Sequence, residues 1–293
     1  MEQKLDHFDS SERRTFKQRY YSYDQFYHED RGNIFLYVCG EAACGGVPVG
    51  SYPTYLGIQK QGLVFALEHR YYGESLPLGK DSLTDDNLKW LTIDNALEDL
   101  ASFIEYANDN KTTSKISPNA KWIIIGGSYS GAVSAWFREK YPHLVVGSWA
   151  SSPVIHPILN FTDFDRQIYL SSLKSGIECP TAVQNVTKYL EKQLYNYGPD
   201  HAKETKLRFS PFADKLNNEE FLWYFADTIV LGVQYGHRTE LCDILMPVAA
   251  NMTNLWETTI RYFNSVENDP RDYGSHYLSD PTPGDGGRQW YYQ

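Results

Sequence analysis

The stretch KWIIIGGSYSGAVSAWFREKYPHLVVGSWASSPV, residues 121–154, indicates the fold of this chain more clearly than any other. Residues 122–125 form an apolar, β-branched run that is typical of a short buried strand. Two glycines interrupt the run, Ser128 follows them, and small and apolar residues then recur at helical spacing. Because Pro142 cannot continue a helix, we expect the helix to end near residue 141 and a second strand to cover 144–150.

A strand, a tight glycine turn, a serine and a helix in this order are the context of a nucleophile elbow. The helix N-terminus offers free N–H groups and the positive end of a dipole to developing negative charge. The usual pattern is G-x-S-x-G; here Gly126 holds the first position, Ser130 the last, and Gly131 follows. The last position requires a small side chain, which serine provides. We predict Ser128 as a nucleophile, against the alternative of a glycine-rich turn with an incidental serine.

A second loop of small residues follows the buried strand expected at 33–39. This loop, GEAACGG at 40–46, lets backbone N–H groups face a ligand. In an α/β-hydrolase, one oxyanion donor is the N–H of the residue after the nucleophile, and the other comes from such a loop. We therefore predict the N–H of Tyr129 and an N–H near Glu41 or Ala42 as donors. The alternative is a plain glycine turn pinned by a disulfide.

The order of the remaining elements predicts the fold class. A buried strand is expected at 62–68 and an amphipathic helix at 92–107, with Thr92 as its N-cap. Strands that alternate with helices in this way predict a mostly parallel sheet with helices on its faces. At the end of the second strand, Glu68 and Arg70 are expected to form a structural ion pair.

Beyond residue 154 the apolar spacing becomes helical and buried-strand runs stop. Helices are expected at 162–173, 181–195, 219–233 and 239–264, which together suggest an all-helical insertion. Residues 268–287 are rich in Pro, Gly and Asp and are expected to form a linker or loop.

Composition limits the partners. The net charge is −10, from 37 acidic and 27 basic residues, which argues against nucleic acid or an anionic membrane as partner. No run approaches the roughly 20 apolar residues of a membrane span. Four sequons begin at Asn110, Asn160, Asn185 and Asn251, which favours a glycosylated protein of the secretory pathway whose leader is missing from this chain.

The four cysteines fit no zinc pattern, and we expect neither a metal nor a cofactor. An even number of cysteines in a secretory chain suggests two disulfides. Cys39–Cys44 and Cys179–Cys242 are the favoured pairs, although four cysteines allow three pairings.

Several motifs together resemble one family of serine peptidases. They are LDHF at 5–8, FKQRYY at 16–21, CGE at 39–41, LEHRYYGES at 67–75, the block at 126–154 and RQWYYQ at 288–293. The chain is similar to the family of lysosomal Pro-X carboxypeptidase, dipeptidyl peptidase II and thymus-specific serine protease, and most similar to its plant-type branch. The resemblance covers only the N-terminal part of the family.

The resemblance implies an α/β-hydrolase core with an inserted helical cap, and hydrolysis of peptides next to proline from one chain end. Ser128 matches the family's nucleophile. The family's aspartate and histidine lie downstream of the motif at 288–293, so neither is expected in these 293 residues. A serine hydroxyl needs a base within hydrogen-bond reach. The chain alone is therefore expected to be inactive.

We thus predict an incomplete α/β-hydrolase core at 1–155, a helical cap at 156–280 and a return toward the core at 281–293. The predicted function is a proline-directed serine exopeptidase, secreted, lysosomal or vacuolar, that acts through an acyl-enzyme on a peptide substrate. The alternative is a non-catalytic secreted binding protein on a truncated hydrolase scaffold. A lipase or esterase is disfavoured because the HGGG-type loop is missing.

Overall fold

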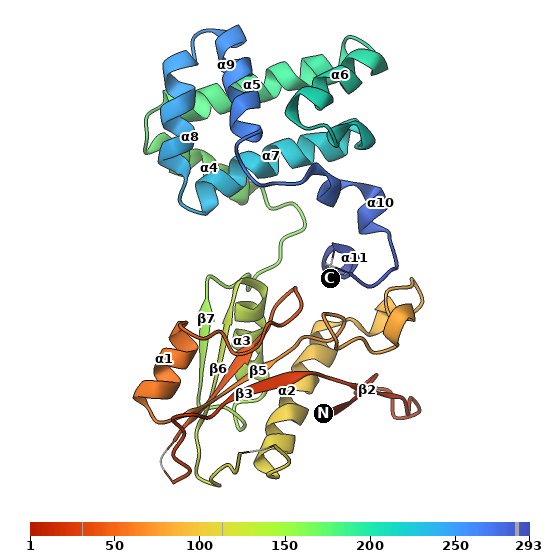
Figure 1. The fold of residues 1–293 in the computed structure, drawn as a ribbon, viewed down its shortest axis with the longest axis vertical. Coiled ribbons are helices and arrows are strands. Elements are labelled where there is room, and N and C mark those ends of the chain that lie inside the picture. The colour runs from red at the N-terminus through yellow and green to blue at the C-terminus, as the bar shows by residue number, and fades with distance from the viewer. Residues whose placement is uncertain (31, 113, 285–286) are drawn as a thin grey trace. The chain divides into compact units, whose positions relative to one another are not determined.

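The structure, a computed structural model, describes residues 1–30, 32–112, 114–284 and 287–293. The chain divides into two compact units. Unit 1 comprises Met1–Pro157 and Pro281–Gln293, and unit 2 comprises Ile158–Asp280. Every strand that the structure describes lies in unit 1, whereas unit 2 is built from helices (Figure 1).

Unit 1 is built around a five-stranded sheet with the strand order β3-β5-β4-β6-β7. Its strands are β3 (Tyr20–Tyr23), β4 (Ile34–Val38), β5 (Leu63–Leu67), β6 (Trp122–Gly127) and β7 (Gly147–Ser151). The last four strands run parallel, and β3 pairs with β5 in the antiparallel direction at one edge. A separate ribbon pairs β1 (Glu2–Lys4) with β2 (Thr15–Lys17). The predicted α/β fold with a mostly parallel sheet is confirmed.

Helices cover both faces of this sheet (Figure 1). The helices of unit 1 are α1 (Tyr52–Gln59), α2 (Ile93–Asn108), α3 (Ser128–Lys140) and α11 (Gly287–Tyr292), with 3-10 turns η1 (Gly79–Asp81) and η2 (Leu88–Trp90). One face of the sheet packs against apolar side chains of α2 and α3, such as Phe103 and Val133. The other face packs against Leu56 of α1. Burial on both faces explains why the central strands read as continuous apolar runs.

Two differences from the expected elements of unit 1 concern a strand of the sheet and a helix that packs on it. The strand expected at 144–150 begins only at Gly147, because residues 141–144 form a turn in which Leu144 N–H donates to Tyr141 O. Helix α1 was not predicted; its start carries Ser51 and Pro53, a pattern typical of a helix N-terminus.

Unit 2 is an all-helical body with one aromatic-rich core. Its elements are α4 (Thr162–Leu173), α5 (Glu178–Tyr195), α6 (Pro199–Phe209), η3 (Ala213–Lys215), α7 (Asn218–Gln234), α8 (Arg238–Leu245), η4 (Met246–Val248), α9 (Met252–Phe263), η5 (Pro270–Tyr273) and α10 (Ser275–Leu278). Phe209 lies at the centre of the core, with its ring centroid 5.1 Å from the rings of Trp256 and Phe263.

The elements of unit 2 differ from the expected ones in three places. The helix expected at 239–264 is two helices, since Pro247 lacks an N–H and Asn251 caps a new helix by accepting from Asn254 N. Helix α6 was missed, although Pro199 directly follows a glycine at its start. Residues 285–286 of the linker or loop expected at 268–287 lie outside the described residues. Its described part contains η5 and α10, and Asp269 caps η5 by accepting from the N–H of Arg271.

Candidate active site

Ser128 lies where β6 ends and α3 begins. Its φ is +53°, in the left-handed region that non-glycine residues seldom adopt. This conformation costs about 1–3 kcal/mol and persists only where the surrounding structure holds it. Ser128 is exposed, so it does not lie among packed side chains. A strained, exposed serine at the N-terminus of a buried-strand-to-helix turn has the geometry of a nucleophile elbow.

Glycines allow β6 and α3 to approach closely at this turn. A Cβ on Gly126 would lie 2.1 Å from the carbonyl oxygen of Ser130, which no side chain can tolerate. A Cβ on Gly131 would lie 3.0 Å from the carbonyl oxygen of Ser151, on the neighbouring strand β7. The close crossing therefore needs glycine at 126 and a very small residue at 131.

Ser130 stabilises the turn through hydrogen bonds to the backbone of Gly127. It is buried, and its hydroxyl donates to Gly127 O at 2.8 Å and accepts from Gly127 N at 3.2 Å. A Cβ on Gly40 would lie 3.6 Å from Ser130 Oγ, so the loop after β4 lies beside the first turn of α3. The serine that replaces the usual glycine thus has a structural role of its own.

The small-residue loop after β4 is closed into a ring by a disulfide between Cys39 and Cys44. Glu41 in this ring is half-buried, and burial raises its pKa although a hydrogen bond from Trp290 opposes the shift. Burial also raises the pKa of the Tyr129 hydroxyl, and the charge of Glu41 contributes to that shift. These couplings place Glu41 near the turn, while the second oxyanion donor near Glu41 or Ala42 stays a prediction.

Glu68 links two loops to the end of β5. Its carboxylate is fully buried. One oxygen accepts from Cys44 N at 2.9 Å and from Arg19 Nη2 at 2.5 Å. The other oxygen accepts from Ser75 Oγ at 2.6 Å and from Glu74 N at 3.1 Å. Glu68 therefore holds the disulfide loop and the loop after β5 in one arrangement.

The expected ion pair between Glu68 and Arg70 does not form. Strand β5 ends at Leu67, and beyond it the two side chains reach different partners: Glu68 pairs with Arg19, and Arg70 pairs with Asp99 of α2. Arg70 is fully buried and meets both carboxylate oxygens of Asp99 at 2.7 Å. Its remaining N–H groups donate to the carbonyl oxygens of Lys4, Leu5 and Trp90.

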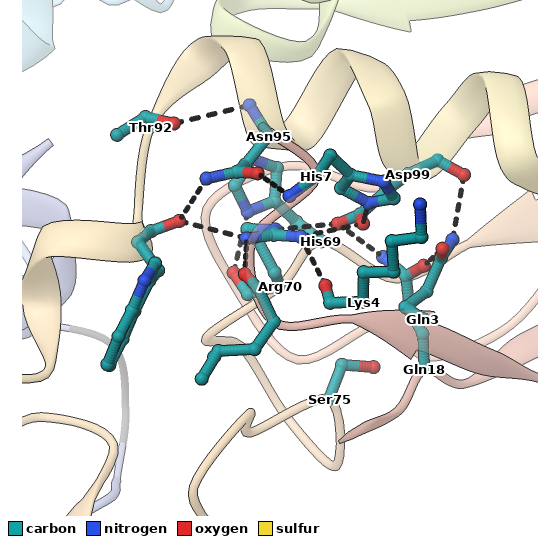
Figure 2. A network of polar contacts seen from close by, with 12 residues as sticks. Gln3, Lys4, His7, Gln18, His69, Arg70, Ser75, Thr92, Asn95 and Asp99 are labelled. Atoms are coloured by element: carbon teal, nitrogen blue, oxygen red, sulfur yellow. Dashed lines mark hydrogen bonds and ion pairs between the residues drawn. The ribbon is translucent and has the colours of Figure 1, made fainter. Parts of the chain in front are cut away.

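Figure 2 shows the buried network around this pair. His7 Nε2 lies 2.8 Å from Asp99 Oδ1, and Gln3 donates to the Asp99 carbonyl oxygen at 2.8 Å. Gln18 donates to the carbonyl oxygen of Glu68 at 2.8 Å. Burial acts to raise the pKa of Asp99, but the opposite charge and hydrogen bonds of Arg70, with those of His7, lower it overall. The network ties the N-terminal ribbon and α2 to the loop after β5.

His69 connects this network to the turn at Ser128, through Tyr129. It is buried, and its Nδ1 lies 2.7 Å from the Arg70 carbonyl oxygen, so Nδ1 carries the proton. Nε2 therefore accepts from the hydroxyl of Tyr129, at 2.9 Å. Burial lowers the pKa of His69 to about 4. The imidazole is neutral at neutral pH, and its acceptor nitrogen is already occupied.

No histidine that the structure describes hydrogen-bonds to Ser128. His7 is held by Asp99, His69 by Tyr129, His201 by Gln193 and His237 by Glu240. The described part of the chain thus provides a strained serine and free helix N–H groups, without a base at the serine. Likewise, its described residues contain no group of three potential metal ligands.

The motif at 288–293 also lies in unit 1, in α11. Gln289 Nε2 donates to the Tyr71 carbonyl oxygen at 3.1 Å, and Arg288 Nε donates to the Leu83 carbonyl oxygen at 2.6 Å. With the contact of Trp290 to Glu41, these bonds bring α11 against the loops around the turn.

Sequence reasoning did not identify Asp99 as part of this arrangement. One signal was present: Asp99 lies three residues after Ala96 and four before Phe103, on the apolar face of the helix. A carboxylate on a buried helix face predicts a buried cation. Which cation it meets depends on the course of the chain after β5, which no local pattern encodes.

The four predicted glycosylation sites lie at different places. Asn110, Asn160 and Asn251 are exposed, and Asn185 is half-buried on α5. The second disulfide joins Cys179 of α5 to Cys242 of α8 within unit 2. Within the described ranges, no helix combines the length and the apolar character that a membrane crossing requires.

Comparison with known proteins gives a consistent assignment. The family model described as serine carboxypeptidase S28 matches residues 3–293. The probable serine protease EDA2 of Arabidopsis thaliana is 39% identical over 265 residues, 89% of this chain and 52% of the relative. The thymus-specific serine protease of Homo sapiens is 33% identical over 268 residues, 87% of this chain and 51% of the relative.

The lysosomal Pro-X carboxypeptidase of Bos taurus is 42% identical over 195 residues, which are 63% of this chain and 37% of the relative. The chain spans about half the length, or less, of these curated relatives. The match of the family model over nearly all of the chain agrees with the turn geometry at Ser128. The chain belongs to the serine carboxypeptidase S28 family.

Proposed function

We propose that this chain carries the nucleophile half of a serine exopeptidase site that cleaves peptides next to proline. Ser128 Oγ attacks the scissile carbonyl carbon and gives its proton to a base, the C–N bond breaks as the amine takes a proton, and water then hydrolyses the acyl-enzyme. The family resemblance implies a histidine as the base and an aspartate that orients it. Preference for proline rests on the name of the Pro-X carboxypeptidase relative.

The observation that carries the proposal is the φ of +53° at an exposed Ser128 on the N-terminus of α3. The first N–H groups of a helix have no intrahelical partner, so Tyr129 N–H is available to an oxyanion. The half-buried loop at Glu41 supplies the second donor. Family membership supports the same chemistry.

The experiment tests the environment of residue 128 with and without the need for a base. In the 293-residue chain we expect Ser128 to react only slowly with a fluorophosphonate probe, because its hydroxyl has no base among the described residues. A Ser128→Cys variant needs no base, since a thiol ionises by itself, and a helix N-terminus lowers its pKa. The pH dependence of alkylation by iodoacetamide gives the pKa of the introduced thiol. We expect this pKa to lie about one unit or more below the usual value near 8.5.

The reaction is read by mass spectrometry of the alkylated peptide, which also verifies that both native disulfides are intact. A Ser22→Cys variant, at an exposed serine of β3, provides an ordinary thiol for comparison. An introduced thiol at 128 that titrates like the one at 22 would overturn the proposed nucleophile site. Strong fluorophosphonate labelling of the 293-residue chain would instead overturn its proposed inactivity in isolation.

A non-catalytic binding role is the second candidate, because no described histidine hydrogen-bonds to Ser128. An ordinary thiol at 128, in a chain that its native source secretes as a stable product, would favour it. In both cases we propose a secretory-pathway protein, secreted, lysosomal or vacuolar, with glycans at the four sequons. Two disulfides support that location. Loss of mass on treatment with a peptide N-glycosidase tests the glycans.

A further inference from the structure

Tyr129 connects the nucleophile turn to the buried network. Its backbone N–H is in the first turn of α3, directly after Ser128, where it faces no intrahelical acceptor. Its side chain is buried, and its hydroxyl donates to His69 Nε2 at 2.9 Å. One residue thus has its amide at the proposed oxyanion position and its hydroxyl at an internal anchor.

Buried contacts also hold the imidazole of His69 in place. His69 Nδ1 donates to the carbonyl oxygen of Arg70, and the Arg70 guanidinium meets Asp99 through two hydrogen bonds of 2.7 Å. The ring of Tyr72 lies edge-on to the imidazole, with 5.5 Å between the ring centroids. The imidazole can therefore neither turn over nor shift without breaking bonds to groups that are themselves buried.

The backbone at Ser128 needs such support. A non-glycine residue at positive φ persists only where its surroundings hold it. Ser130 holds the turn through Gly127, on the side of the strand. The bond from Tyr129 to His69 holds it from the other side, through the side chain next to the strained residue. Removing that bond leaves a buried hydroxyl without its acceptor and frees the Tyr129 ring to move.

We propose that His69 is a positioning residue for the oxyanion site: through the Tyr129 hydroxyl it holds the Tyr129 N–H in the direction that stabilises negative charge next to Ser128. The inference rests on the proposed function of Ser128. His69 acts here as a neutral acceptor and not as the base. The charged and titratable groups around the imidazole are those of Arg70, Asp99, Tyr72 and Tyr129, and Glu68 directly precedes His69 in the chain.

The test measures the pKa of the thiol in the Ser128→Cys background, where an anion forms at the site without a base. His69→Leu removes the acceptor, and we expect it to raise that pKa by about half a unit, the size of a lost helix N-terminal contribution. Tyr129→Phe removes the donor and keeps the ring, and should raise it by a similar amount. His69→Gln offers an amide oxygen as acceptor and should restore much of the shift.

Coupling between the two residues distinguishes positioning from general damage. If His69 acts through Tyr129, the double variant His69→Leu/Tyr129→Phe raises the thiol pKa no further than Tyr129→Phe alone. The matched control is His143→Gln, an exposed histidine beyond the other end of α3, which should leave the pKa unchanged. Where His69→Leu fails to fold, Tyr129→Phe alone tests the proposal, because it preserves the side-chain volume.

The outcomes separate the two proposals. A thiol of ordinary pKa in the parent Ser128→Cys chain overturns the proposed function, and the inference falls with it. A lowered parent pKa that neither His69→Leu nor Tyr129→Phe raises overturns the inference alone. An additive double variant also overturns it, because His69 would then act on the site by another route.

Discussion

The two units of this chain bury different kinds of side chain. Unit 2 has an apolar core of helices packed through aromatic rings. Among its described residues, Lys206 is the buried ionisable group besides the tyrosines. Unit 1 buries Glu68, His69, Arg70 and Asp99 at 5% exposure or less, all connected to the surroundings of Ser128. Buried charges are costly even when paired, and hydrophobic replacements are often as stable. Their concentration in one unit indicates that they fix geometry there, whereas packing suffices in the other.

The largest expected effect comes from breaking the charge pair of unit 1. Arg70→Met leaves the carboxylate of Asp99 buried without its cation, and we expect it to lower the free energy of unfolding of unit 1 by about 3–5 kcal/mol. Guanidinium unfolding followed by hydrogen-exchange mass spectrometry measures this for each unit separately. The double variant Arg70→Met/Asp99→Leu should recover much of the loss. A double variant as unstable as the single one would contradict the comparison.

The sequence allowed the elements of unit 1 to be predicted better than the contacts between them. The strand, glycine turn and helix around Ser128 follow from local apolar spacing and from Pro142, and all lie within a few residues of their expected places. The ion-pair partners of Glu68 and Arg70 do not follow from local spacing, because these partners, Arg19 and Asp99, are distant in sequence. Pairing of buried charges depends on how the chain turns after β5, which is a tertiary property.

Unit 2 shows the opposite limit of sequence reasoning. Continuous helical spacing from 239 to 264 hid the break between α8 and α9, and only the cap at Asn251 with Pro247 before it marks that break. The missed helix α6 has few strongly apolar residues, so its pattern was weak. An apolar core tolerates many helix arrangements, and periodicity alone does not select one.

The next largest effect should come from removing a disulfide, and the loss of stability should differ between the two units. Cys179–Cys242 closes a loop of 63 residues, so its replacement by serines should cost unit 2 about 2–4 kcal/mol through the freedom of the unfolded chain. Cys39–Cys44 closes only 5 residues and should contribute less stability. Thermal unfolding of each double-serine variant measures both. A larger loss from the short bridge would show that it supports unit 1 by more than loop closure.

Between pH 6.5 and 4, an acid-induced loss of stability is expected from His69 of unit 1. His69 has a folded-state pKa of about 4 against an ordinary value of 6.5, so the unfolded chain takes up its proton first as the pH falls. Stability is full above pH 6.5 and declines toward pH 4, by up to about 3 kcal/mol. The lowered pKa of Asp99 acts in the same direction, but only below its ordinary value of 3.8.

Denaturant unfolding at a series of pH values separates these two groups. His69→Gln carries no imidazole, so its stability should be nearly constant between pH 6.5 and 4, while the decline below 3.8 remains. A variant with the same slope as the parent between pH 6.5 and 4 would assign that slope to another group.

The smallest effects come from helix caps, which the two units share. Thr92 accepts from Asn95 N at 3.2 Å at the start of α2, and Asn217 accepts from Glu220 N at 2.8 Å at the start of α7. We expect Thr92→Ala and Asn217→Ala each to cost about 1 kcal/mol. The loss should be larger for Asn217, because its side-chain capping bond is the shorter of the two.

The thiol pKa provides a second measurement, which shows whether each cap affects the site at residue 128. Helix α2 carries Asp99, which holds Arg70 and, through it, His69. In the Ser128→Cys background, Thr92→Ala should therefore raise the thiol pKa slightly, and Asn217→Ala should leave it unchanged. Thr92→Ser keeps the capping oxygen and is the matched control. Equal shifts from both caps would mean that the thiol responds to general stability, because only the cap on α2 is connected to the turn through buried hydrogen bonds.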